Sequence, residues 1–413
     1  MDKTHSFKGK EMLFRVFTII CFILLAFNSH ADQIIEFGNI GSKLSYKTGS
    51  INKETYNGFA ADISLFDNET LFGNIKTLKI DSQKMPNGKN NINLLSIKDL
   101  TLFPDEFGIQ INLEKFEITD IGQEIFEYFN NVMEGDSSPE VPNYNIEEHK
   151  NFSFNLSGLK FEGDDLNLEI SSMSFPKVKY GTLSSGQEFA KESTFEMNGF
   201  SFVPNPENIE MLPLSIILAS IGQQSLKLDL FGEATVEDKG LLLDMFSNFE
   251  FNMSGAALLK ISLNYLVPIE TYNYFYNNSS LIEEMQNQNF ESLDSINNEI
   301  LMELGKIQLS KINIQIEDLG VRKPLLIMYA SSVGASEEEA LSFINMTIQG
   351  LFSQFIPANA DKFSEIISQF LIEGGEIELT VSPPNPLPLI SAAGLFVMPD
   401  LAIESLGVKL QTR

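Results

Sequence analysis

The chain has 413 residues, among them 34 phenylalanines, and its formal net charge is −28. Such an acidic surface repels phosphate backbones, because nucleic-acid binding depends on lysine and arginine neutralising phosphates. Nucleic acid and bare anionic membranes are therefore disfavoured as partners. The hydrophobic content of 43% supplies enough apolar material for one large domain or two ordinary ones.

Residues 1–31 have the features of a secretory signal peptide. Basic residues between positions 3 and 15 precede an apolar run at 16–27, and small residues around Ala31 form a cleavage site before Asp32. The run is shorter than the roughly 20 residues that a membrane-spanning helix needs. We expect a periplasmic or secreted protein, cleaved between Ala31 and Asp32, with no integral membrane span afterwards. An uncleaved N-terminal anchor is the alternative.

A repeated spacing of apolar residues, separated by two, three and two positions, organises most of the chain. Its clearest copy consists of Phe154, Leu156, Leu159 and Phe161. Other copies occupy Leu95 to Leu102, Ile111 to Ile118, Leu168 to Phe175, Phe195 to Phe202 and Ile307 to Ile314, with a weaker one from Phe251 to Leu258. Side chains alternate between the faces of a strand, so the gap of three requires that one residue be absorbed.

Two local structures would absorb that residue. A β-bulge sets two residues of one strand opposite one residue of its neighbour and leaves the strand continuous. A two-residue hairpin loop would instead fold each copy back on itself, for example at Asn198 and Gly199. Most copies carry poor turn residues such as Lys-Asp or Glu-Lys at this point, which favours the bulge. Under both interpretations the four apolar residues share one face.

Three helices are predicted between the strands of the first three hundred residues. Apolar residues at three- and four-residue spacing indicate a short amphipathic helix from Ile121 to Met133. The apolar segment 212–221 is too short to span a bilayer and predicts a buried helix. A third helix is predicted from Ser280 to Leu304, after an aromatic run at 272–276.

The last hundred residues are predicted to contain three helices followed by strands. A helix is predicted from Pro324 to Gly334, and Ser336 with Glu339 has capping-box spacing ahead of a second helix. A third helix is expected at 359–372, ending at Gly374-Gly375. Strands follow at 377–381 and 407–411.

These elements together predict an α+β, β-rich fold. Curved, mainly antiparallel amphipathic sheets with bulged strands would have helices packed on the apolar face. We predict a signal peptide at 1–31, a repeat-strand region at 32–265 and a mixed helix and strand region at 266–413.

The closing segment resembles the tail of uncharacterised exported proteins of alphaproteobacteria. The similar features are the helix start at 334–339, the Leu-Thr-Val strand at 379–381 and the proline-rich run at 383–389. This resemblance implies no known activity. The repeated strands are more loosely similar to those of AsmA-like envelope proteins, whose curved sheets are associated with lipids. That likeness is architectural and supports function only by analogy.

Little of the usual catalytic chemistry is present. After residue 31 the chain has no cysteine and one histidine, His149, so the common nucleophile and base pairs are missing. The acidic residues Glu162, Asp164 and Asp165 lack EF-hand spacing for Ca²⁺. We therefore predict a non-enzymatic protein with no catalytic residues, no cofactor and no metal. A carboxylate-dependent hydrolase is the alternative that the many acidic residues leave open.

The phenylalanine-rich faces are either ordinary core or, in part, a groove for an acyl chain, since binding sites are concave and mostly apolar. The candidate lining residues are the bulkiest ones, Phe152, Phe154, Phe161, Phe195, Phe200 and Phe202. The leading hypothesis is an envelope protein that binds a lipid-like apolar ligand on a curved sheet. The alternative is a structural protein with a sealed core, whose acidic surface meets an envelope protein partner. The aromatic run at 272–276 could instead form an interface patch.

Overall fold

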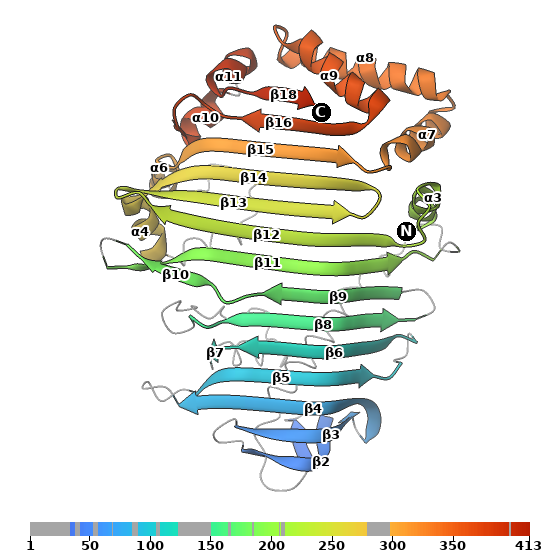
Figure 1. The fold of residues 1–413 in the computed structure, drawn as a ribbon, viewed down its shortest axis with the longest axis vertical. Coiled ribbons are helices and arrows are strands. Elements are labelled where there is room, and N and C mark those ends of the chain that lie inside the picture. Colours follow the sequence, from blue (N-terminus) through green and yellow to red (C-terminus); the bar gives the residue numbers. More distant parts are fainter. Residues whose placement is uncertain are drawn as a thin grey trace. The chain divides into compact units, whose positions relative to one another are not determined.

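The protein consists of two compact units. The computed structural model describes residues 34–37, 42–52, 57–67, 69–84, 90–104, 108–122, 150–163, 167–183, 186–205, 207, 211–278, 298–395 and 398–413. Residues 1–178 form the N-terminal unit and residues 179–413 the C-terminal unit. Both consist mainly of antiparallel strands, and the second also carries helices, which confirms the predicted α+β, β-rich class (Figure 1). The predicted signal peptide lies outside the described residues, and the predicted boundary near residue 266 falls within strand β14.

The N-terminal unit is an antiparallel meander. Its strands are β1 (Ile34–Phe37), β2 (Ser42–Asn52), β3 (Asn57–Asp67), β4 (Thr70–Lys84), β5 (Asn90–Leu102), β6 (Gln110–Thr119), β7 (Ile121–Gly122), β8 (Ser153–Glu162) and β9 (Asn167–Phe175). Each strand pairs with the next along the chain, except that the short β7 pairs with β5, which leaves β6 to pair with β8. Such hairpin connections follow naturally from short links between strands.

At one level of this sheet, the ladder of paired residues is interrupted on every strand from β2 to β6 and on β8 and β9. The skipped row consists of Lys47, Asp62, Lys76, Asp99, Glu114, Gly158 and Ser171. Three of these residues, on alternate strands, have a left-handed backbone, with φ of 52° at Asp62, 50° at Asp99 and 63° at Gly158. Because neighbouring strands skip at the same level, the register is identical on both sides of the row.

The six full copies of the repeat therefore lie along continuous strands, and the hairpin alternative is wrong for them. A one-sided bulge does occur in the C-terminal unit, where the register of β11 shifts against β12 between Met197 and Phe200. In the N-terminal unit the extra residue is instead shared by adjacent strands. The weaker copy is a hairpin, since Met253 pairs with Ala257 across its turn.

The apolar residues of the repeat form one face and one core in the N-terminal unit. Leu156 pairs with Met173, and Leu159 pairs with Ile170. A single buried cluster contains these leucines together with Leu95, Ile97, Leu100 and their neighbours on β3 to β6. Complete burial of a leucine or isoleucine side chain contributes roughly 1.5–3 kcal/mol relative to exposure. The shared face that the spacing predicts is thus confirmed in this unit.

The strands of the C-terminal unit are antiparallel as well. They are β10 (Lys179–Thr182), β11 (Glu188–Val203), β12 (Leu226–Asp238), β13 (Leu242–Met253), β14 (Ala257–Pro268), β15 (Gln308–Asp318), β16 (Gly375–Val381), β17 (Leu387–Pro388) and β18 (Lys409–Thr412). The strands follow one another from β10 to β16. Strand β18 then pairs with β16, and β17 pairs with β15.

The described helices all lie in the C-terminal unit. They are α3 (Leu212–Ser220), α4 (Ile269–Asn277), α6 (Asn298–Leu304), α7 (Arg322–Val333), α8 (Glu337–Phe355), α9 (Ala360–Glu373), α10 (Leu389–Leu395) and α11 (Pro399–Ser405). Helix α4 follows the end of β14, whereas α7 follows the end of the antiparallel β15. The two helices therefore lie at opposite ends of the strands (Figure 1).

Local signals in the last hundred residues are confirmed. The hydroxyl Oγ of Ser336 accepts a hydrogen bond from the backbone N–H of Glu339 at 3.3 Å, and the Glu339 carboxylate accepts one from the Ser336 N–H at 2.8 Å. This capping box begins α8, as its spacing predicts. Helix α7 ends at Gly334, whose φ of 68° suits glycine, and α9 ends at Gly374.

Three helix predictions change with the structure. Segment 212–221 is helical, but the prediction that it is buried is wrong, because Leu212 and Ile216 are exposed and only Leu218 is fully buried. Ile121, the predicted start of the first helix, belongs to strand β7, and residues 123–149 lie outside the described ones. The predicted helix at 280–304 is described only from residue 298, where α6 begins.

Candidate functional site

The C-terminal sheet has one apolar face, which cross-strand register defines. One row of side chains consists of Phe195, Gly232, Phe249, Ile261, Ile314 and Leu379, and the adjacent row consists of Met197, Leu230, Phe251, Leu259, Ile316 and Ile377. We call these two rows the apolar face. The opposite side is polar, as the aligned Glu233, Asn248 and Ser262 show.

The middle of the apolar face is open to solvent. Phe249 is 44% exposed, Phe251 39% and Ile316 41%, whereas equivalent side chains of the N-terminal unit, such as Ile97 and Leu100, are buried. Large apolar side chains that lie together and exposed are typical of binding surfaces. The same type of sheet is therefore sealed in one unit and open in the other.

Gly232 shapes this face by leaving room for an aromatic ring. A Cβ atom placed on Gly232 would lie 3.4 Å from the ring of Phe249 and 4.0 Å from the Cβ of Phe195. The Phe249 ring therefore lies over the bare backbone of β12. Glycine in a strand interior often marks such a close approach.

Helix α4 covers one end of the sheet. Its residues Ile269 and Tyr272 pack against Val236, Leu243 and Val267, which the register places at that end of the strands. Burial there raises the pKa of Tyr272, and the neighbouring Tyr276 adds to the rise. Tyr272 of the aromatic run thus packs on the sheet, and its ring stacks on that of Tyr276 with centroids 6.3 Å apart.

Helices α7, α8 and α9 cover the other end and enclose a pocket of about 390 Å³ against the sheet. Ala257 and Ile316 line it from β14 and β15, and the helices contribute mostly leucine, isoleucine, tyrosine and phenylalanine side chains. Helix α9 is also joined to β18, where the Thr412 hydroxyl donates a hydrogen bond to Oε1 of Gln369 at 3.2 Å. Helices therefore pack on this apolar face, as the sequence predicts.

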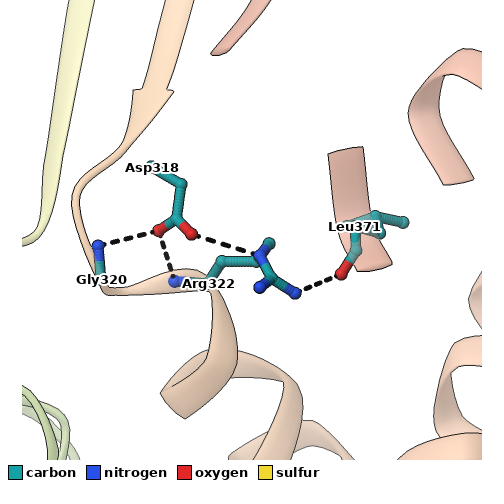
Figure 2. Close-up of polar contacts among 4 residues, drawn as sticks. All are labelled: Asp318, Gly320, Arg322 and Leu371. Atoms are coloured by element: carbon teal, nitrogen blue, oxygen red, sulfur yellow. Dashed lines mark hydrogen bonds and ion pairs between the residues drawn. The ribbon is translucent and has the colours of Figure 1, made fainter. Parts of the chain in front are cut away.

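An ion pair holds these helices at the end of β15 (Figure 2). The carboxylate of Asp318 accepts hydrogen bonds from the backbone N–H groups of Gly320, at 3.1 Å, and Arg322, at 3.0 Å. The Arg322 Nε donates to the same carboxylate at 3.2 Å, and its Nη1 donates to the carbonyl of Leu371 in α9. The pair thus connects β15, the start of α7 and the end of α9.

The six predicted lining residues divide between the two units. In the N-terminal unit Phe161 is 3% exposed, Phe154 makes an edge contact with Phe116 at 5.5 Å, and the ring of Phe152 lies 5.9 Å from that of Phe175. Phe161 belongs to the buried cluster of this unit and Phe154 packs against it, while Phe152 is half-buried; the lining role of all three stays a prediction.

In the C-terminal unit Phe195, Phe200 and Phe202 are half-buried and pair with Gly232, Leu228 and Leu226. Their role as lining residues stays a prediction. Sequence reasoning missed Phe249 and Ile316 as site residues, since spacing shows which face a side chain takes but not whether another element covers it.

The described ranges contain no group of three histidine, cysteine or acidic side chains arranged for a metal. Of the candidate Ca²⁺ ligands, Glu162 accepts a hydrogen bond from Asn112 at 3.1 Å, whereas Asp164 and Asp165 lie outside the described residues. The single histidine, His149, also lies outside them. Among the described helices, none combines the length and the apolar character needed to cross a membrane.

Residues 269–413 match a protein family described as "Uncharacterized protein". The match runs from α4 to β18 and so includes the pocket helices, but it leaves out β1 to β14. No curated protein matches the chain. The chain is therefore similar to an uncharacterised family over its C-terminal part, where the sequence resemblance also lies.

Proposed function

We propose that this protein is a non-enzymatic, exported envelope protein that binds a lipid-like apolar ligand on the apolar face of the C-terminal unit. The observation that carries the proposal is the exposure of Phe249 and Phe251 on β13 and of Ile316 on β15, which share one face of the sheet with β14 between them. Exposed apolar area of this kind gains roughly 25 cal/mol per Å² when it is covered.

The arrangement of the helices supports a ligand that lies across the strands. Helix α4 covers one end of the apolar side and α7 to α9 cover the other, while the middle stays accessible. A hydrocarbon chain needs no directional hydrogen bonds, so a surface of phenylalanine, leucine and isoleucine suits it. Mostly apolar lining with few polar groups is the common character of ligand sites.

The charge of the chain restricts the head group of such a lipid. With a formal net charge of −28, the protein repels anionic lipids at long range. A neutral or zwitterionic head group suits this field better. The signal-peptide features of residues 1–31 support an envelope or secreted location, and the likeness of the repeated strands to AsmA-like proteins adds an analogy.

Binding of a fluorescent, zwitterionic single-chain lipid tests the proposal. Phe251→Ser should weaken binding about tenfold, because it removes an apolar ring from the face. Phe246→Ser is the matched control, since Phe246 lies on the same strand and faces the polar side. Equal binding by both variants and the unchanged protein, or no binding by any of them, would overturn the proposal.

A protein partner is the second candidate, and helix α8 favours it. Phe343, Met346, Leu351 and Phe355 are all exposed on this helix. Aromatic residues and methionine are enriched in protein interfaces. A stoichiometric partner that is lost with Phe343→Ser, while lipid binding is absent, would support this candidate.

A further inference from the structure

We propose that the pocket beneath α7 and α8 holds the terminal part of a single hydrocarbon chain whose remainder lies on the apolar face. This inference rests on the proposed function and adds to it a direction for the ligand. The chain would lie across β13 to β15, with its end in the pocket and its head group on the open part of the face.

The pocket continues the apolar face without interruption. Ile316 lines the pocket and is also a member of the row that contains Phe251 and Leu259. Ala257, which lines the pocket from β14, pairs with Met253 next to that row. A chain that covers Phe251 and Leu259 therefore reaches the pocket through Ile316.

The size of the pocket suits one chain. Its volume of about 390 Å³ lies at the small end of the range of roughly 300–1,000 Å³ for ligand pockets. Leu325 and Tyr329 line it and are also exposed to solvent, so the pocket has a mouth. Leu326, Leu341 and Ile344 close its inner side as part of the contact between α7 and α8.

The charges around the pocket favour a tail over a head group. Asp318 and Arg322 bond to each other, and the guanidinium also donates to the carbonyl of Leu371. The third charged residue of the lining, Glu317, belongs by register to the polar side of β15, opposite Ile316. A charged head group inside the pocket would have to displace these interactions, whereas an alkyl chain leaves them intact.

Photocrosslinking locates the chain. We would use two lysophosphatidylcholine probes, one with a diazirine at the terminal carbon and one with it at mid-chain. The terminal probe should label peptides from α7 and α8, and the mid-chain probe should label β13 to β15. Labelling of the strands by both probes overturns the pocket assignment but leaves the proposed function in place. No specific labelling by either probe overturns both.

A pocket-filling variant gives a second, independent measurement. Ala257→Leu should lower the affinity for palmitoyl lysophosphatidylcholine roughly 10- to 50-fold, because each excluded methylene costs about fourfold. The shorter lauroyl lipid should bind unchanged. Ala234→Leu is the control, since Ala234 lies on the same side of the sheet but away from the pocket. If both lipids weaken equally with Ala257→Leu, the pocket does not hold the chain end.

Discussion

Asp318 and Arg322 are joined twice, once through the backbone N–H and once through the guanidinium of the arginine. Their side chains are only 11% and 20% exposed. The same arginine reaches the carbonyl of Leu371, so one side chain connects both ends of the helical cover to strand β15.

Arg322→Ala should therefore loosen the helical cover. We expect a loss of about 2–4 kcal/mol in the free energy of unfolding, because a shielded carboxylate would lose its partner. Hydrogen exchange should quicken at the start of α7 and the end of α9. The control is Lys239→Ala, which breaks an ion pair whose side chains are 46% and 68% exposed and should leave the unfolding midpoint unchanged. An equally small effect of Arg322→Ala would contradict the role of this pair.

Gly158→Ala tests the skipped row. Gly158 has a φ of 63°, and a Cβ placed there would lie 2.3 Å from Cγ of Glu114 on the neighbouring strand. We expect a loss of about 1–3 kcal/mol, the larger values arising if the glutamate cannot move aside. Gly108 has a similar φ of 72°, and a Cβ placed there would have no atom within 4 Å. Gly108→Ala therefore measures the cost of the left-handed backbone alone. Denaturant titration of both variants checks the difference, which would vanish if the close approach were absent.

The buried pair Asn91 and Asp120 joins β5 to the junction between β6 and β7. The Asp120 carboxylate accepts hydrogen bonds from Nδ2 of Asn91, at 2.7 Å, and from the backbone N–H of Asn151, at 2.6 Å. Asp120→Gly should cost about 2–4 kcal/mol, since it removes the acceptor of the buried Asn91 amide and of the Asn151 N–H. Asp62→Gly is matched, because Asp62 has a similar left-handed φ but is exposed, and it should change stability by less than about 1 kcal/mol. Equal losses measured by thermal unfolding would argue against the buried bonds.

Acid should weaken the capping box at the start of α8. Hydrogen bonds from the backbone and side chain of Ser336 lower the pKa of Glu339 below its ordinary value of 4.5. Because the folded pKa is depressed, the stabilisation is complete above that ordinary value and is lost as the pH falls through the lower folded one. Amide chemical shifts of Ala340 should follow this titration. Glu339→Gln keeps the cap and should remove the pH dependence. The control Glu338→Gln should preserve it. A pH dependence that persists in Glu339→Gln would show that Glu339 is not the titrating group.

The elements that sequence predicts well depend on neighbours in the chain. Ser336 and Glu339 are three positions apart, so their spacing alone predicts the capping box. The spacing of Leu156 and Leu159 likewise predicts a shared face. Whether adjacent strands absorb the additional residue together depends on register, which residues such as Glu114 and Gly158 acquire only when distant strands pair.

The open part of the candidate site was beyond prediction for a different reason. Phe161 and Phe202 hold the same place in their copies of the repeat, yet the first is buried and the second only half-buried. Their difference depends on which elements cover each face, and no local pattern encodes that. Segment 212–221 shows the same effect, because its composition predicts burial while Ile216 faces solvent.

Because of the skipped row, a change in the number of residues in one strand of the N-terminal unit must be matched by its neighbours. Deleting Asp99 alone would turn the following leucines of β5 outward, while β4 and β6 would still skip a residue at that level. A duplicated hairpin, by contrast, would already contain the skipped residue at the right level in both of its strands. Such a sheet can grow during evolution by whole pairs of strands, whereas isolated one-residue insertions or deletions within a strand would be selected against.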